Sequence, residues 1–283
     1  MEIHNRLCEE SFGYTKEKLT LPEREKELID LYDISEYCKN IKEKIEYNAG
    51  TFYSQSAEEG LSIADWLYSL GKPEEIEIKQ LLGRMIEQMW KDGTPESGEP
   101  EILCSLGKHD GTAYHMESYL GERRQILENI TDVVVYAEIM PSCFANSIFA
   151  DDIGVEMEKI PEFALHTEEL TRNLSVLNDE ALEIYYRNNK DANLAMKELE
   201  GKLLACRPDF NHQKELQYEF SYEVEEDGEI VKKRKKITCH PHLKLIRKDS
   251  DYRIYFAWKD EDVGKNEKIL VGRIGSHGWK KRR

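Results

Sequence analysis

The chain has 283 residues, a formal charge of −16, and hydrophobic residues at 40% of its positions. This length and apolar content exclude a disordered chain and allow either one large domain or two smaller ones. No apolar run reaches the roughly 18–20 residues that span a bilayer, and the first residues lack the apolar core of a signal peptide. We therefore expect a cytoplasmic protein with no membrane contact.

Charge is divided unevenly along the chain. Residues 206–283 hold 19 Lys and Arg against 14 Asp and Glu, whereas the rest holds 21 against 42. A basic segment joined to a strongly acidic one predicts that the C-terminal part binds a polyanion. The six cysteines are far apart and form no C-x-x-C pair, which predicts reduced, mostly buried thiols.

Helical spacing dominates the first 130 residues. Apolar residues three and four apart predict a helix within 20–47, and two more are predicted between Ser56 and Gly93. Residues 93–111 read as a long loop, and a further helix is expected over 112–130. We place Trp66 and Trp90 in the core, because both lie at helical spacing among apolar residues.

The stretch DVVVYAEIM, residues 132–140, has the β-branched run of a buried strand, and helices are expected again from 161 to 205. The organisation that we expect is an acidic, helical regulatory or partner-binding region over 1–125 and an α+β domain over 126–283. The expected fold class is α+β, with a mainly helical N-terminal region followed by a C-terminal antiparallel four-stranded β-meander. Its core sheet should span about 214–278.

The predicted meander has one apolar face and one basic face. Apolar and polar residues alternate over 216–224, and the turn EEDGE leads into a return strand over 230–245. Tyr252, Ile254, Phe256 and Trp258 share a face in the next strand, with Arg253 and Tyr255 opposite. Pro241 marks an edge or a bulge, because proline cannot donate to a strand ladder.

The basic face carries residue types that suit chemistry on RNA. Cleavage without a metal uses the 2′-hydroxyl as nucleophile, so the protein supplies a base, an acid and positive charge for the phosphorane. His242, His277, Lys244 and Arg253 are of those types. A structural metal on Cys239, His240 and His242 is disfavoured, because alternation sends Cys239 to the other face. A merely solvated sheet face remains the alternative.

The segment LKLIRKDSDYRIYFAWKDEDVGKNEKILVGRIGSH resembles the C-terminal half of the RelE/ParE superfamily of bacterial toxins. RelE members cut messenger RNA in the ribosomal A site, and ParE members poison gyrase. The resemblance implies that Arg253 stabilises the phosphorane, that Lys244 binds the phosphate, and that His242 and His277 act as base and acid. It covers a small part of the chain, and family members are much shorter.

The resemblance therefore predicts a metal-independent endoribonuclease toxin, ribosome-dependent, with no cofactor and with RNA, the ribosome and an antitoxin or phage-defence protein as partners. The acidic region would regulate it by occupying the basic face. A non-catalytic nucleic-acid-binding or partner-binding adaptor is the rival, and a gyrase inhibitor is a third reading. The run KKRKK either contacts RNA or protects a sheet edge. The expected RNA contacts are Lys232, Lys233, Arg234, Lys235, Lys236, Arg273, Trp279, Lys280 and Lys281.

Overall fold

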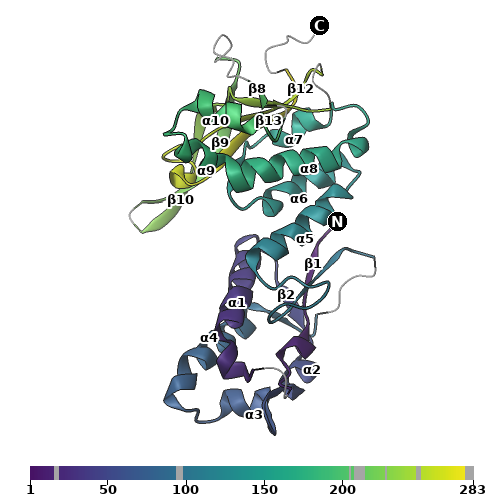
Figure 1. The fold of residues 1–283 in the computed structure, drawn as a ribbon, viewed down its shortest axis with the longest axis vertical. Coiled ribbons are helices and arrows are strands. Elements are labelled where there is room, and N and C mark those ends of the chain that lie inside the picture. The colour runs from purple at the N-terminus through teal and green to yellow at the C-terminus, as the bar shows by residue number, and fades with distance from the viewer. Residues whose placement is uncertain are drawn as a thin grey trace. The chain divides into compact units, whose positions relative to one another are not determined.

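The structure is a computed structural model with helices dominating its N-terminal part and most strands in its C-terminal part (Figure 1). It divides into two compact units, unit 1 (Met1–Arg123) and unit 2 (Arg124–Arg283), and the division falls within helix α5 (Met116–Glu128). None of the described helices is both long and apolar enough to cross a bilayer. The structure describes residues 1–15, 19–93, 98–203, 205–206, 214–226, 228–246 and 250–277.

Unit 1 is mainly helical, as the sequence predicts, but it also contains a small parallel sheet that the sequence did not predict. Strands β5, β2, β1 and β6 lie side by side in that order, all parallel. Each has only two to four residues, too few to show an alternating pattern. The elements are β1 (His4–Leu7), α1 (Glu25–Asn40), β2 (Ile45–Tyr47), α2 (Ala49–Ser54), β3 (Ser56–Glu58), β4 (Leu61–Ser62), α3 (Ile63–Tyr68), α4 (Ile76–Gln88), β5 (Trp90–Lys91) and β6 (Glu101–Cys104).

The helix expected after Ser56 starts later than predicted. Residues 56–62 form the short antiparallel pair β3–β4 instead, so Ser56 caps no helix. The N-cap of α3 is Ser62, whose hydroxyl accepts a hydrogen bond from the amide of Asp65 at 3.1 Å. Helix α1, within the expected 20–47, is confirmed, and α5 lies within the expected 112–130.

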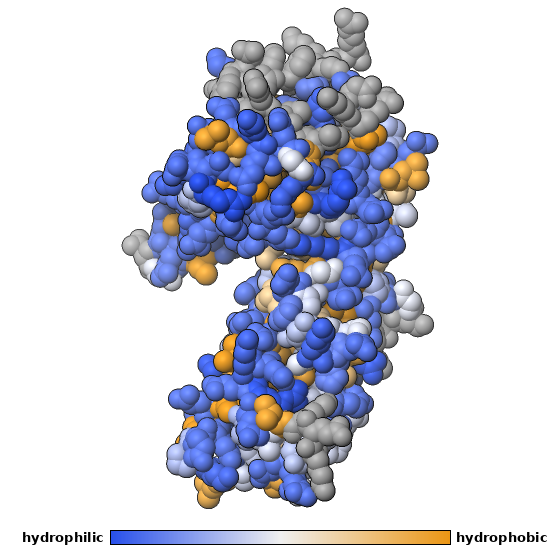
Figure 2. Space-filling model, in the orientation of Figure 1, coloured by the Kyte–Doolittle hydropathy of each residue, from blue (hydrophilic) through white to orange (hydrophobic). Residues whose placement is uncertain are grey.

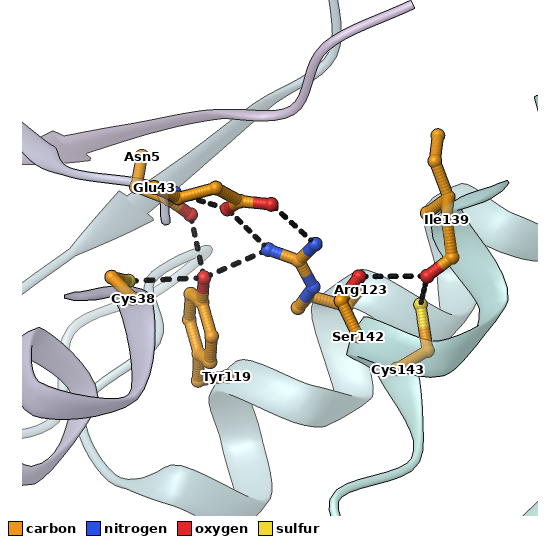
Figure 3. A network of polar contacts seen from close by, with 8 residues as sticks. All are labelled: Asn5, Cys38, Glu43, Tyr119, Arg123, Ile139, Ser142 and Cys143. Atoms are coloured by element: carbon orange, nitrogen blue, oxygen red, sulfur yellow. Dashed lines mark hydrogen bonds and ion pairs between the residues drawn. The ribbon is translucent and has the colours of Figure 1, made fainter. Parts of the chain in front are cut away.

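A buried polar network joins α5 to the sheet of unit 1 (Figure 3). The guanidinium of Arg123 donates to both carboxylate oxygens of Glu43, at 2.7 and 2.8 Å, and to the hydroxyl of Tyr119 at 2.9 Å. That hydroxyl donates to Asn5 at 2.8 Å and contacts the thiol of Cys38 at 3.2 Å. Burial raises the pKa of the Cys38 thiol to about 12, so this thiol stays protonated near neutral pH.

In unit 2 a mixed five-stranded sheet lies against a layer of helices (Figure 1). Among the described residues its strand order is β7-β13-β12-β11-β8, and β7 runs parallel to β13 while the other pairs are antiparallel. The elements are α6 (Val133–Ile139), β7 (Ser147–Phe149), α7 (Ile153–Met157), α8 (Thr167–Val176), α9 (Leu182–Arg187), α10 (Ala192–Leu199), β8 (Ala205–Cys206), β9 (Gln217–Glu226), β10 (Glu229–Thr238), β11 (His242–Lys244), β12 (Tyr252–Ala257) and β13 (Ile269–Ser276).

The strand predicted at residues 132–140 is wrong, because this stretch is helix α6. The Asp132 carboxylate caps it by accepting hydrogen bonds from the amides of Val134 and Val135, at 2.8 and 3.2 Å. This cap and the burial of Tyr136 outweigh the β propensity of three valines. The strand that comes before the helices α8–α10 is β7 instead, and it runs parallel to β13.

The predicted four-stranded meander is also wrong, because the return strand breaks at Pro241. Strands β9 and β10 form their own two-stranded sheet, and β11 belongs to the larger one. Cys239 and Leu243, expected on one face, are buried in two different cores. Leu243 faces the helices, whereas Cys239 packs with the hairpin β9–β10 on the opposite face of the sheet.

Gly272 allows the hairpin to pack closely on β13. It lies where the register of β12 and β13 shifts, since Tyr255 pairs with Arg273 and Phe256 with Val271. A Cβ atom at this position would collide with the ring of Tyr218 and would lie 2.7 Å from the sulfur of Cys239. Only glycine therefore fits beneath the hairpin.

We expect Gly272→Ala to lower the free energy of unfolding by about 1–3 kcal/mol, because the added methyl overpacks this contact. Gly121→Ala is the matched control. Gly121 lies in α5 with nothing within 4 Å of its would-be Cβ, so alanine there should stabilise by about 0.5–1 kcal/mol. Thermal unfolding of both variants checks the prediction, and a Gly272→Ala protein as stable as the original would contradict it.

Candidate functional site

Strand pairing sets the predicted basic residues on one face of the unit 2 sheet. His242 of β11 lies opposite Tyr255 of β12, and Lys244 lies opposite Arg253. Side chains directly across an antiparallel pair share a face. The apolar residues between them, Leu243 and Ile254, point into the helical core, which fixes the face that His242 and Arg253 occupy.

His242, Tyr255 and His277 come together as a histidine–tyrosine cluster. The hydroxyl of Tyr255 is hydrogen-bonded to Nδ1 of His277 at 2.9 Å, with either atom as donor. The ring of His242 lies 5.1 Å from that of Tyr255 and 6.3 Å from that of His277, between centroids. Tyr255 is fully buried and His242 is nearly so, whereas His277 is half-buried.

Hydrogen bonding sets the protonation pattern of His242. Its Nδ1 lies 3.3 Å from the main-chain carbonyl of His240, and a carbonyl oxygen can only accept. The contact therefore keeps a proton on Nδ1, so that in the neutral ring Nε2 is the basic nitrogen. In His277, Nδ1 is hydrogen-bonded to the hydroxyl of Tyr255. The direction of this hydrogen bond therefore decides whether Nε2 carries the proton of the neutral ring.

Arg253 does not occupy the accessible position that an arginine needs to clamp a phosphate. It is buried, and its Nη1 donates to the main-chain carbonyls of Ser250 and Tyr252, the latter at 2.7 Å. Its Nε is buried without a hydrogen-bond partner among the described residues. Arg253 is therefore engaged by the main chain at the start of β12, and the half-buried Lys244 lies opposite it.

Arg273, expected to bind RNA, pairs instead with an acidic side chain of α7. Its Nη2 lies 2.8 Å from a carboxylate oxygen of Glu156, and its Nε donates to the carbonyl of Ser276 at 2.9 Å. A side chain at Gly275 would collide with Glu156, its Cβ lying 3.0 Å from the main-chain oxygen. Arg273 and Gly275 of β13 thus hold the strand against α7.

The basic run of β10 is largely neutralised within the chain. Lys235 donates to Asp260 and Asp262 at 2.8 and 2.6 Å, and these hydrogen bonds raise its pKa. Lys233 pairs with Glu226, and Arg234 lies 3.3 Å from Glu219. Lys232 and Lys236 are exposed. This arrangement favours edge protection over RNA contact for the run as a whole.

Three of the predicted RNA contacts are in the C-terminal tail, outside the described residues: Trp279, Lys280 and Lys281. The five cysteines whose side chains are described are free thiols, and all but the first are buried: Cys8, Cys38, Cys104, Cys143 and Cys239. Burial raises the pKa of the Cys239 thiol, so it is no nucleophile. Within the described ranges no group of three His, Cys, Asp or Glu residues is placed to hold a metal ion.

Tyr255 is the site residue to which sequence reasoning gave no role. The signal was present, because Tyr255 alternates with Ile254 and so shares the face of Arg253. Comparison with known proteins adds no assignment: no family model, curated protein or solved structure matches the chain.

Proposed function

We propose that unit 2 is a RelE-like, metal-independent endoribonuclease, a toxin that cuts messenger RNA. The observation that carries the proposal is the histidine–tyrosine cluster, with two imidazoles 6.3 Å apart between ring centroids. Attacking and leaving oxygens lie on opposite sides of the phosphorus, so an acid and a base must be held about one phosphate apart. Two histidines at this separation suit those roles.

In the proposed reaction His242 is the base, because its Nδ1 proton is held by a carbonyl and its Nε2 accepts. It takes the proton of the 2′-hydroxyl, and the 2′-oxygen attacks the adjacent phosphorus. The bond from phosphorus to the 5′-oxygen breaks, and His277 gives its proton to that oxygen. His277 gives this proton as the imidazolium, in which both ring nitrogens carry hydrogen, so its Nδ1–H donates to the buried hydroxyl oxygen of Tyr255 and the proton on Nε2 is the one transferred.

Lys244 supplies positive charge to the phosphate, and Arg253 adds charge from its fixed place beside it. This differs from the role first expected for Arg253, because the main chain already occupies its Nη1. Cleavage by this route leaves a 2′,3′-cyclic phosphate and a 5′-hydroxyl. The ends of the RNA fragments test the chemistry: these ends support the proposal, and 3′-hydroxyl with 5′-phosphate ends contradict it.

The setting proposed for this activity is a toxin–antitoxin or phage-defence system, with the translating ribosome as the site of cleavage. A non-catalytic adaptor remains the rival, and buried Arg253 favours it in one respect, since a committed guanidinium needs no ligand. The two differ in outcome. The adaptor binds RNA and leaves it intact, whereas the nuclease cuts it.

We also propose that unit 1 restrains unit 2 electrostatically. We infer this restraint from the charge of the two parts of the chain. A chain beginning at Met116 keeps α5 intact and removes most of the acidic residues outside 206–283. We expect it to cleave RNA faster than the full chain, with the difference shrinking as salt rises, because screening weakens such restraint. Equal initial rates for the two chains at low salt would contradict the restraint.

A further inference from the structure

Unit 1 contains a cavity of about 280 Å³ at the edge of its parallel sheet. Its lining combines an aromatic ring, a buried carboxylate and two lysines, contributed by Trp90, Glu46, Lys42 and Lys44. Trp90 was expected in the core, yet it is 54% exposed, at the start of β5. An exposed indole at the wall of a cavity is available to stack on a flat ligand.

Glu46 lies beside Trp90 on the same face, because the two residues are register partners in neighbouring strands. Its side chain is 7% exposed, and one oxygen is 3.3 Å from Nδ1 of His4. The other oxygen, Oε2, is buried and has no hydrogen-bond partner among the described residues. A desolvated carboxylate oxygen without a donor is unfavourable, and an N–H group of a bound ligand would satisfy it.

Gly93 leaves room for this carboxylate. A Cβ atom there would lie 2.9 Å from Cγ of Glu46 and 3.1 Å from Oε2, so any other residue would push the side chain out of place. The position of Glu46 is thus fixed from two sides, by Gly93 and by His4.

The cavity wall carries two lysines beside three carboxylates, those of Glu2, Glu43 and Glu46. Glu43, which also lines it, has both oxygens engaged by Arg123, and Glu46 is paired with His4. Lys42 and Lys44 are exposed, and no acidic side chain pairs with them in the described part of the chain. These lysines suit phosphate groups as point charges.

We propose that this cavity binds a guanine nucleotide, with the base on Trp90, its N1–H and N2–H edge on Glu46, and its phosphates on Lys42 and Lys44. Guanine presents two adjacent donors to a carboxylate. Adenine presents one donor beside an acceptor nitrogen, which a carboxylate repels. A simple ammonium ligand would suit Trp90 and Glu46 but would be repelled by both lysines.

The test is a calorimetric titration of the full chain with GTP, with GMP and with ATP. GTP should bind at least about tenfold more tightly than ATP, since a bidentate base contact discriminates by about 1–3 kcal/mol. GTP should also bind more tightly than GMP, because more of its charge reaches the lysines. Equal affinities for GTP and ATP, or no heat with any of the three nucleotides at 1 mM, would overturn the proposal.

Variants separate the two contacts. Glu46→Gln should bring GTP down to the affinity of ATP, and Trp90→Ala should weaken every nucleotide about tenfold or more. Trp90→Phe, which keeps a stacking ring, should retain the preference for guanine. Glu77→Gln, at an exposed position of α4, is the matched control for the amide change. Unfolding curves show whether each variant is folded. A folded Glu46→Gln protein that still prefers GTP would contradict the assignment of Glu46.

Discussion

Replacing His277 by glutamine should lower the rate of RNA cleavage by about 10²–10⁴-fold, the usual contribution of a positioned acid or base. Glutamine keeps a polar side chain near the hydroxyl of Tyr255 but cannot give up a proton at neutral pH. Binding of RNA should stay within a few-fold, because the charge of Lys244 and Arg253 is unchanged. Single-turnover cleavage of a labelled messenger, with binding measured separately, checks the expectation.

His166→Gln is the matched control, since His166 lies in the same unit at the start of α8 and away from the histidine–tyrosine cluster. It should cleave RNA at the original rate. Tyr255→Phe should give an intermediate loss, because it removes one hydrogen bond to His277 and leaves both imidazoles. If His277→Gln cleaves as fast as the original, His277 is not the acid.

Replacing Arg123 by methionine should lower the free energy of unfolding of unit 1 by about 3–5 kcal/mol. Arg123 is 1% exposed, and its loss leaves the carboxylate of Glu43 largely buried, with the side-chain amide of Asn5 as its remaining donor among the described residues. A buried charge that loses its partner is strongly destabilising. Urea unfolding followed by far-ultraviolet circular dichroism measures the change.

Two further variants identify the cause of this loss. Arg123→Met combined with Glu43→Leu removes both charges and should recover much of the stability, because no charge then stays buried alone. Arg6→Met removes an arginine that is 49% exposed and 3.7 Å from Glu101, and it should cost less than about 1 kcal/mol. A double variant as unstable as Arg123→Met would show that packing, not charge, causes the loss.

Alternation predicted the β12 face correctly, since Ile254 and Phe256 point into the helical core and Arg253 and Tyr255 point away. Alternation failed where a helix cap or a proline decided the structure. Asp132 caps a helix over valines that favour a strand, and Pro241 sends two halves of one apparent strand into different sheets. Neither outcome is visible in the period of apolar residues.

The sequence placed both histidines in the candidate site, but it did not predict the main-chain contacts of Arg253. The register of β11 and β12 sets His242 opposite Tyr255, and His277, directly after β13, is hydrogen-bonded to the hydroxyl of Tyr255. The commitment of Arg253 to main-chain carbonyls depends on the fold of its own connection, which residue type does not reveal. Likewise, the partners of Lys235 are 25 and 27 residues away in sequence.

Mapping messenger cleavage on translating ribosomes by primer extension tests the central claim most directly. The full chain is compared with the variant that carries both His242→Ala and His277→Ala. We predict cuts within A-site codons for the original chain and none for the double variant, while both still bind RNA. Tight RNA binding by the original chain without any cut, or cuts that persist in the double variant, would contradict the account.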